Sequence, residues 1–278
     1  MAHWYKELNG SFTSNFTIKG SKEDPVITFN SKLNNLQWQK FYSPSLELTA
    51  SYQPFDNHKI QLTLKNAQLD ISNQSDDLSL QNIILNFSGD FNQQQLQLDW
   101  QGDLAGKLKF TSQWHEALNQ WQSTIEEAAL TYQQETWRNN NAFSLNFNVD
   151  NQQLFIGKHC WQGTGLDICL TDDAIIGESA DITLGLNMDL SLFDQVILPK
   201  EVQLQSKVSG EITAQWSATQ AISAKANFAL SSGNIKVIDE YNEQQVSQWR
   251  HGQLSFNINE RQLTSKLQLN DSQEQTLI

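Results

Sequence analysis

The sequence predicts an all-β protein built from a long, twisted antiparallel sheet, and three observations indicate this fold class. Apolar and polar residues alternate with a period of two through most of the chain. Short polar breaks separate the alternating runs, and helical segments do not alternate with strands as they do in α/β folds. Because successive side chains of a strand point to opposite faces, each run should present one apolar and one polar face.

The alternating runs begin near residue 60 and continue to the end of the chain. In order, they are Ile60-x-Leu62-x-Leu64 continuing through Leu69 and Ile71, Leu78-x-Leu80, Leu85-x-Phe87, Leu96-x-Leu98-x-Trp100, Phe143-x-Leu145-x-Phe147-x-Val149, Leu184-x-Leu186-x-Met188-x-Leu190, Val202-x-Leu204, Phe228-x-Leu230, Leu254-x-Phe256-x-Ile258 and Leu267-x-Leu269. The polar breaks at residues 73–77 and 92–95 are predicted to be hairpin turns.

One segment is ambiguous, because residues 115–137 contain good helix formers such as Glu126-Glu127-Ala128-Ala129-Leu130. The alternation of Trp121-x-Ser123-x-Ile125 and the lack of a capping signal favour strands there. At roughly 12 residues per strand and turn, the chain should form on the order of 20 strands. Open twisted sheets seldom exceed about ten strands. A second sheet, barrel closure or a ligand must therefore cover the apolar face.

Composition and charge argue against a nucleic-acid-binding protein and against a membrane-spanning helix in this sequence. The net charge is −13, the 18 Lys and Arg residues are scattered, and no basic stripe is present that could bind nucleic acid. No apolar run approaches the length of a membrane-spanning helix, and the sequence shows no signal peptide. Both ends of the sequence are abrupt, so residues 1–278 are expected to form one continuous, elongated β segment of a larger protein.

The two cysteines are predicted to form a disulfide across a hairpin. If Thr164-Gly165 is a two-residue loop, Cys160 lies directly opposite Cys169 in a non-hydrogen-bonded pair, with Cα atoms about 4.5 Å apart. The same register places Trp161 and Ile168 together on the other face. The alternative is a pair of free thiols. A disulfide would indicate an oxidising compartment, here the periplasm.

No arrangement of residues indicates catalysis or metal binding. Neighbouring acids occur at residues 76–77, 126–127 and 172–173, but neighbours in a strand face opposite sides and cannot act as an acid–base pair. His159 and Cys160 are separated in the same way. Two cysteines and a single nearby histidine lack zinc-ligand spacing, and nucleotide-binding or zinc-protease motifs are missing. We therefore expect a protein without catalytic activity, cofactor or metal.

The cysteine hairpin also carries a family resemblance. The segments His159-Cys160-Trp161 and Leu166-Asp167-Ile168-Cys169-Leu170 resemble a cysteine motif of the TamB family. This is the inner-membrane subunit family of the translocation and assembly module, among the AsmA-like, bridge-type lipid transport proteins. Leu198-Pro199, residues 208–216 and Gly233-Asn234-Ile235 follow in the order found in that family. The similarity is best from Trp114 to Val237, and upstream only the periodicity agrees.

The resemblance implies a sheet curled lengthwise into a U-shaped trough whose apolar interior carries phospholipid. It also implies a periplasmic location, an N-terminal inner-membrane anchor absent from this sequence, and an outer-membrane β-barrel partner, TamA, that contacts other parts of the full-length protein. The residues expected to line the trough are Ile60, Leu62, Leu64, Leu96, Leu98, Trp100, Phe143, Leu145, Phe147, Val149, Trp161, Ile168, Leu184, Leu186, Met188 and Leu190.

Two other functions remain open at this point. A non-enzymatic scaffold could assemble outer-membrane proteins or autotransporters by pairing its exposed strand edges with nascent strands. A β-sandwich adhesin or binding module would show the same alternation, because a period-two apolar stripe is also typical of a sandwich core. An outer-membrane barrel is disfavoured because no aromatic girdles are evident.

Overall fold

The computed structural model describes residues 8–56, 58–72, 78–132, 135–192, 199, 201–239, 242–259 and 262–271. These residues form 22 strands and two short 3-10 helices, in agreement with the predicted all-β class. The chain divides into two units, residues 1–150 and residues 151–278, each of which is described by itself. Whether the two form one continuous segment stays a prediction.

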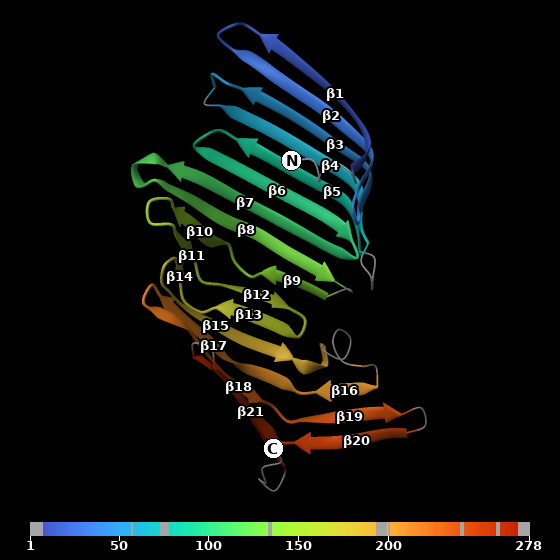
Figure 1. Cartoon of the computed structure of the whole chain (residues 1–278), viewed down its shortest axis with the longest axis vertical. Helices are drawn as coiled ribbons and strands as arrows, with labels where there is room; N and C mark the ends of the chain where they lie inside the picture. The colour runs from blue at the N-terminus through green and yellow to red at the C-terminus, as the bar shows by residue number, and fades with distance from the viewer. Residues whose placement is uncertain are drawn as a thin grey trace. The chain divides into compact units, whose positions relative to one another are not determined.

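The first unit is a single-layer antiparallel meander (Figure 1). Each strand from β1 to β8 pairs with the next along the chain, and β9 and β10 both pair with β8. Its elements are β1 (Leu8–Gly20), β2 (Pro25–Trp38), β3 (Phe41–Gln53), β4 (Lys59–Ile71), β5 (Leu78–Gly89), β6 (Gln93–Gly102), β7 (Leu104–His115), η1 (Glu116–Leu118), β8 (Gln120–Tyr132), β9 (Glu135–Asn139) and β10 (Phe143–Asn148).

Apart from the short helix η1, the described part of the ambiguous segment is confirmed as strands, and a β-bulge explains its mixed pattern. Phe110 of β7 pairs with Ile125, but its neighbour Lys109 pairs with Glu127, so Glu126 is an extra residue in β8. An inserted residue shifts the alternation by one position. Apolar residues on both sides of the bulge, such as Ile125 and Leu130, therefore face the same side although their spacing does not fit a regular strand.

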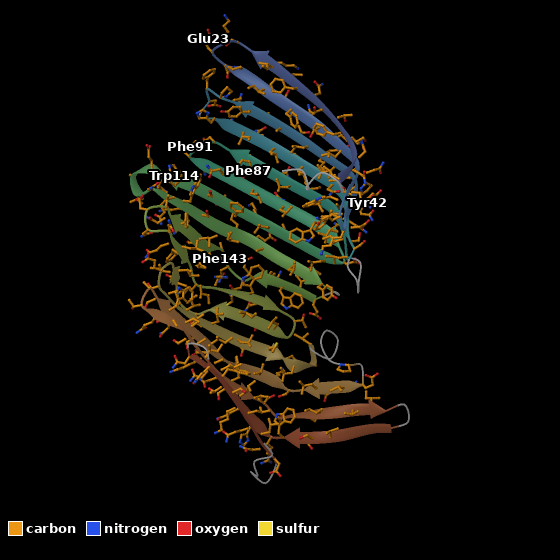
Figure 2. All side chains as sticks on the ribbon, in the orientation of Figure 1. Glu23, Tyr42, Phe87, Phe91, Trp114 and Phe143 are labelled. Atoms are coloured by element: carbon orange, nitrogen blue, oxygen red, sulfur yellow. A yellow bond between two sulfur atoms is a disulfide. The ribbon has the colours of Figure 1, made fainter. Side chains whose placement is uncertain are left out.

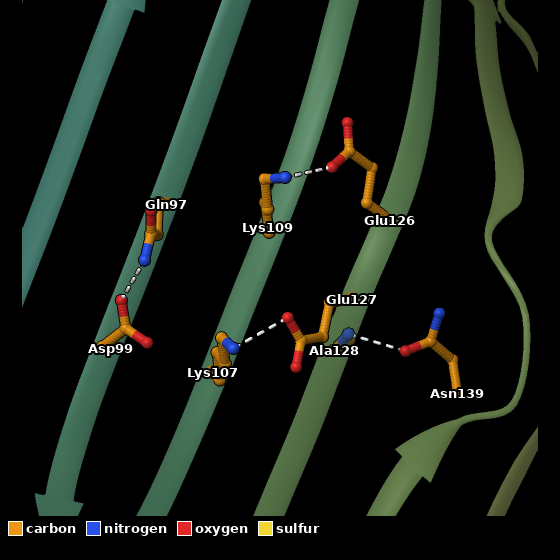
Figure 3. A network of polar contacts seen from close by, with 8 residues as sticks. All are labelled: Gln97, Asp99, Lys107, Lys109, Glu126, Glu127, Ala128 and Asn139. Carbon is orange, nitrogen blue, oxygen red and sulfur yellow. Dashed lines mark hydrogen bonds and ion pairs between the residues drawn. The ribbon is translucent and has the colours of Figure 1, made fainter.

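Asn139 is the last residue of β9 and lies beside the bulge, next to the gap that separates β9 from β10. Its side chain is buried, and its Oδ1 accepts a hydrogen bond of 2.6 Å from the backbone N–H of Ala128 (Figure 3). Its Nδ2 donates to the backbone oxygen of Asn141. The asparagine side chain thus takes the place of a missing strand residue, so that the backbone of β8 keeps a hydrogen-bond partner there.

The alternation also changes parity part-way along β2 to β5. In β2, the apolar side carries odd-numbered residues up to Leu33 and even-numbered residues from Leu36. Asn35 in β2 and Asn82 in β5 adopt the left-handed conformation, each with φ of 51°, which asparagine tolerates better than most residues. The register of the sheet aligns these changes across neighbouring strands. Figure 1 shows these strands bending towards one end.

Polar side chains are buried where the alternation changes. Ser43 of β3 is 2% exposed, and its Oγ donates a 2.9 Å hydrogen bond to Oδ1 of Asn66 in β4. The same Oδ1 accepts from the backbone N–H of Gln68. Because buried polar atoms are costly without partners, this pair keeps the bent region of the sheet hydrogen-bonded.

The second unit contains one larger and one smaller antiparallel sheet. Its elements are β11 (Gln153–Ile156), β12 (His159–Gly163), β13 (Leu166–Leu170), β14 (Ala174–Ile176), β15 (Ala180–Asp189), η2 (Leu190–Leu192), β16 (Val202–Gln205), β17 (Lys207–Ser217), β18 (Gln220–Leu230), β19 (Gly233–Asp239), β20 (Asn242–Trp249), β21 (His251–Asn259) and β22 (Gln262–Asn270). The order β12-β13-β15-β17-β18-β21-β22 forms the larger sheet, β11 pairs with β14, and β16-β19-β20 form the smaller sheet.

The chain passes between the larger and the smaller sheet at three breaks, where one strand ends and the next begins after one or two residues. The breaks fall between β16 and β17, between β18 and β19, and between β20 and β21. At this line Ser206 is buried and its Oγ donates to the backbone oxygen of Ser231. The indole Nε1 of Trp249, which is 2% exposed, donates to the same oxygen. These bonds satisfy a carbonyl that pairs with no strand there.

The prediction of a turn over residues 92–95 is wrong, because β6 already begins at Gln93. Asp90 makes the turn instead: its Oδ1 accepts hydrogen bonds from the backbone N–H groups of Asn92 and Gln93. Such an aspartate-centred turn needs only a few residues, so the glutamines continue the strand. The turn predicted over residues 73–77 lies outside the described residues.

Candidate functional site

A continuous apolar row crosses the first unit. In the pairing register, one apolar residue of each strand lies directly opposite one of the next, across nine strands. The row is Phe16, Phe29, Ala50, Leu62, Phe87, Leu96, Phe110, Ile125 and Phe143. A parallel row on the same side, two residues along each strand, contains Leu48, Leu64, Leu85, Leu98, Leu108 and, beyond the bulge, Ala128. We call the surface formed by these two rows the apolar face.

The opposite side of the same strands is polar. The row between the two apolar rows in sequence contains Asn15, Asn30, Thr49, Thr63, Asn86, Gln97, Lys109 and Glu127. One adjacent pair is joined by a side-chain hydrogen bond, in which Oγ1 of Thr63 donates to Oδ1 of Asn86 over 3.0 Å. Because residues of this row alternate with those of the apolar rows, the two faces of the sheet differ completely in chemistry.

The apolar face is left partly open. Among the hydrophobic side chains of the first unit that the structure describes, only Ala128 is fully buried, at 6% exposed. The members of the rows are half-buried by contacts with their neighbours, and those nearest β1 are more open, with Phe16 59% exposed. A β-sandwich core would bury both inner faces. Within the first unit, no described second layer of strands covers this face.

The predicted lining residues of the first unit fall on this face, with one exception. Ile60, Leu62, Leu64, Leu96, Leu98, Trp100, Phe143, Leu145 and Phe147 all face the same side as the rows. Val149 lies beyond the end of β10 and is 42% exposed, so its predicted place in the strand is wrong. The sequence prediction missed Phe16, Phe29, Leu108 and Phe110, although Leu108-x-Phe110 follows the same alternation.

Trp100 shows how closely the face is packed. Its indole lies over Gly106 of β7, where an added Cβ would come within 2.1 Å of the Trp100 ring. Gly106 and Trp100 are partners in the pairing register. A glycine opposite a large aromatic side chain therefore lets the ring lie flat against the sheet instead of standing above it.

The second unit repeats the pattern. Its apolar row crosses seven strands through Trp161, Ile168, Leu186, Gly210, Phe228, Leu254 and Leu267. Leu184 and Met188 face the same side, as predicted. Leu190 does not belong to the strand, because β15 ends at Asp189 and Leu190 begins η2. Its backbone N–H donates to the carbonyl oxygen of Ser206, so its predicted place in the strand is wrong, while its role in lining stays a prediction.

The cysteine hairpin is confirmed in register and in bonding. Cys160 lies opposite Cys169, and Trp161 lies opposite Ile168. The two cysteines form a disulfide with their Cα atoms 4.0 Å apart. Gly165 in the loop has φ of 71°, a left-handed conformation that glycine adopts without steric cost. The disulfide lies on the polar face, so the apolar row of the second unit crosses the hairpin without interruption.

The charged residues near the bulge lie on the polar face and pair with one another (Figure 3). Nζ of Lys107 is 2.8 Å from Glu127, and Nζ of Lys109 is 2.5 Å from Glu126. The hydrogen bond with Glu127 raises the pKa of Lys107 above its usual value. The prediction that Glu126 and Glu127 face opposite sides is wrong, because the bulge turns both towards the lysines of β7.

Two further acidic side chains, Asp173 and Glu47, have structural partners. Oδ1 of Asp173 accepts from the backbone N–H of Lys158, as expected of a turn residue, and residues 76–77 lie outside the described residues. On the polar face, the hydrogen bond from Lys32 lowers the pKa of Glu47. These groups are exposed, so their ion pairs stabilise the sheet only slightly.

The described part of the chain holds no group of three or more His, Cys, Asp or Glu side chains that could bind a metal ion. Within the same residues, no helix has the length and apolar character needed to cross a bilayer. The fold and the apolar face together define an all-β protein in which the sheet of the first unit and the larger sheet of the second unit each carry an apolar row.

This chain belongs to the family described as the N-terminal domain of TamB, which matches residues 1–278. The family match thus extends well upstream of the region where sequence motifs indicated it. The chain is 24% identical over 211 residues to the translocation and assembly module subunit TamB of Haemophilus influenzae. The aligned region covers 74% of the chain but only 16% of that relative. No solved structure matches the chain significantly.

Proposed function

We propose that this chain is a periplasmic bridge segment that shields phospholipid acyl chains during transport between the inner and outer membranes. The observation that carries the proposal is the apolar row across nine strands, which is backed by a polar row and left partly open. At about 4.8 Å between strands, the eight intervals of the row span about 38 Å. A surface of this length and chemistry suits a long hydrocarbon chain better than a compact ligand.

Magnitudes support a lipid as the ligand. A 16-carbon acyl chain in water costs about 0.8 kcal/mol for each exposed CH₂ group, or more than 10 kcal/mol in total. A continuous apolar row lowers this cost and needs no catalytic residue. The partly exposed Phe and Leu side chains of the same row also gain from being covered. Both partners therefore benefit from the contact, without any specific polar recognition.

The curvature of the carrier is part of the proposal. The aligned parity changes in β2 to β5, with Asn35 and Asn82 in the left-handed conformation, bend the sheet of the first unit. A sheet bent lengthwise in this way would form a U-shaped trough with the apolar face inside. Bulges that re-aim strands support such curvature. The disulfide supports a periplasmic location, since disulfides persist in oxidising compartments.

The partners of the whole protein are part of the same proposal. The relative from Haemophilus influenzae is named a subunit of a translocation and assembly module. We extend this assignment to the present chain, with an inner-membrane anchor and contact with the barrel subunit TamA through other parts of the full-length protein. The scaffold function remains the competing proposal, and it requires binding of unfolded strands instead of lipid.

Lipid that copurifies with the chain tests the proposal. We expect the protein, purified from a bacterial periplasm in the absence of detergent, to release phospholipid in a reproducible molar ratio on organic extraction. Mass spectrometry would identify the lipid, and a periplasmic β-sandwich of similar size would control for membrane carry-over. Protein free of lipid that instead captures unfolded outer-membrane barrel peptides would contradict the carrier function and favour the scaffold.

A further inference from the structure

Besides the polar β1–β2 connection at residues 21–24, four connections of the first unit lie at one edge of its sheet. The β3–β4, β5–β6 and β7–β8 hairpins are neighbours there, because Ile60 pairs with Gly89 and Gln93 pairs with Gln113. The backbone N–H of Trp114 donates to the carbonyl oxygen of Asn92 over 2.8 Å. Figure 2 shows Phe91 and Trp114 near this edge and Tyr42 near the other. The end of β10 is the fourth connection, because the N–H of Val149 donates to the carbonyl oxygen of Asn119.

Each of these connections ends in an exposed apolar side chain. Phe55 is 69% exposed, Phe91 59%, Leu118 55% and Val149 42%. We call these four residues the tip row. At the opposite edge, the described residues in the connections are Gln39, Lys40, Ser72 and Asp103, which are all polar. The strand ends at that edge carry Trp38, Tyr42 and Tyr132, which are 37%, 39% and 38% exposed, less than any member of the tip row. A row of more exposed apolar side chains indicates an interaction surface.

An acidic residue accompanies every member of the tip row. Asp56 follows Phe55, Asp90 precedes Phe91, Glu116 lies two residues before Leu118, and Asp150 follows Val149. Asp56 forms an exposed ion pair with Nζ of Lys59 at 3.9 Å, and Asp90 and Asp150 accept hydrogen bonds within the turns. Glu116 is exposed and has no ion-pair partner among the described salt bridges. The surface thus alternates apolar and negatively charged groups.

The spacing of the row matches one secondary structure. The three hairpin tips Phe55, Phe91 and Leu118 are two strand spacings apart, about 9.6 Å, so they extend over about 19 Å. Val149 lies beside the third tip, because its N–H bonds to Asn119. In an α-helix, residues seven positions apart are about 10.5 Å apart, and roughly 14 residues span about 21 Å. A helix lying along the edge would therefore place one residue of every seven on each hairpin tip.

We propose that the tip row is a docking surface for a basic amphipathic helix of a partner protein. The helix carries an apolar residue at every seventh position, which contacts the tips, and Lys or Arg residues beside it, which face the acidic groups. Charge complementarity favours this occupant over a bilayer surface, because acidic side chains are repelled by anionic lipids. The surface lies on the edge of the sheet, so the inference does not depend on lipid binding to the apolar face.

A pair of synthetic peptides tests the spacing. The probe is a fluorescent helical peptide of roughly 22 residues, with leucine at every seventh position and lysines beside it. The comparison peptide has the same composition, with the leucines distributed around the helix. Fluorescence anisotropy with the full chain should show at least about tenfold tighter binding of the probe, and added salt should weaken this binding.

Two sets of variants locate the site. Phe55→Ser/Phe91→Ser/Leu118→Ser should remove the preference for the probe. The matched triple Ile222→Ser/Val246→Ser/Leu263→Ser changes equally exposed residues of the second unit and should leave it unchanged. Asp56→Lys/Glu116→Lys should weaken probe binding while keeping the apolar tips, which separates loss of the site from loss of the fold.

Three results would overturn the proposal. Equal binding of the two peptides would show that spacing plays no part. Full binding by the tip-row triple would place the peptide elsewhere. The tip-row triple variant would also be tested for binding to phosphatidylcholine vesicles. If it lost vesicle binding but kept its preference for the probe peptide, the tips would be a membrane contact.

Discussion

Phe87→Asp is expected to reduce the phospholipid that copurifies with the chain by about thirtyfold or more. Phe87 lies in the middle of the nine-strand apolar row, between Leu62 of β4 and Leu96 of β6. A carboxylate there stays hydrated in the lipid-free protein but loses water when an acyl chain covers it. The penalty for that desolvation, at least about 2 kcal/mol, greatly exceeds the gain from a single CH₂ contact.

The neighbouring Asn86→Asp is the matched control for this experiment. It introduces the same charge one residue away on the polar face, where Asn86 accepts a hydrogen bond from Thr63 that aspartate can also accept. We expect lipid content equal to that of the unmodified protein. Circular dichroism would show that both variants fold. Equal lipid content in Phe87→Asp and Asn86→Asp would mean that lipid does not contact this face.

Loss of the disulfide is expected to have the largest effect on stability. Cys160→Ser/Cys169→Ser removes a cross-link between residues nine positions apart. The chain-entropy relation gives a loss of about 2.5 kcal/mol in the free energy of unfolding. Hydrogen exchange should show the loss first in β12 and β13. Because the disulfide lies on the polar face, the lipid that copurifies should not change while the protein remains folded.

Reduction of the unmodified protein provides the control for this prediction. A mild reductant should lower its stability to that of the double serine variant and should not affect the variant further. Unfolding at the same denaturant concentration for oxidised protein and variant would show that the cross-link does not constrain the unfolded chain. A parallel loss of lipid would mean that the hairpin shapes the lipid-contacting face.

The sequence was sufficient to predict features that depend on neighbouring residues. Period-two alternation assigns a residue to a face without knowledge of the partner strand, so Leu62, Leu98 and Phe143 were placed correctly. The cysteine hairpin was predicted in its full register, because a two-residue loop fixes which residues lie opposite each other. Both results follow from local geometry alone.

Features that depend on distant pairing were not predicted. The bulge at Glu126 and the left-handed residues Asn35 and Asn82 shift the alternation, and only the partner strands show where. The alignment of nine strands into one row, and of four connections into the tip row, depends on long-range register. Val149 and Leu190 were misassigned because alternation continues in the sequence after the strand has ended. The irregular spacing of Ile125 and Leu130 was the one available signal of the bulge.

Site-specific photocrosslinking in cells tests the central claim most directly. A photoreactive amino acid would replace Leu62, in the nine-strand row, and separately Thr63, in the polar row one residue away. The lipid-carrier function predicts phospholipid adducts at position 62 and none at position 63, as detected by mass spectrometry. Absence of lipid at both positions, in folded protein at normal abundance, would contradict it.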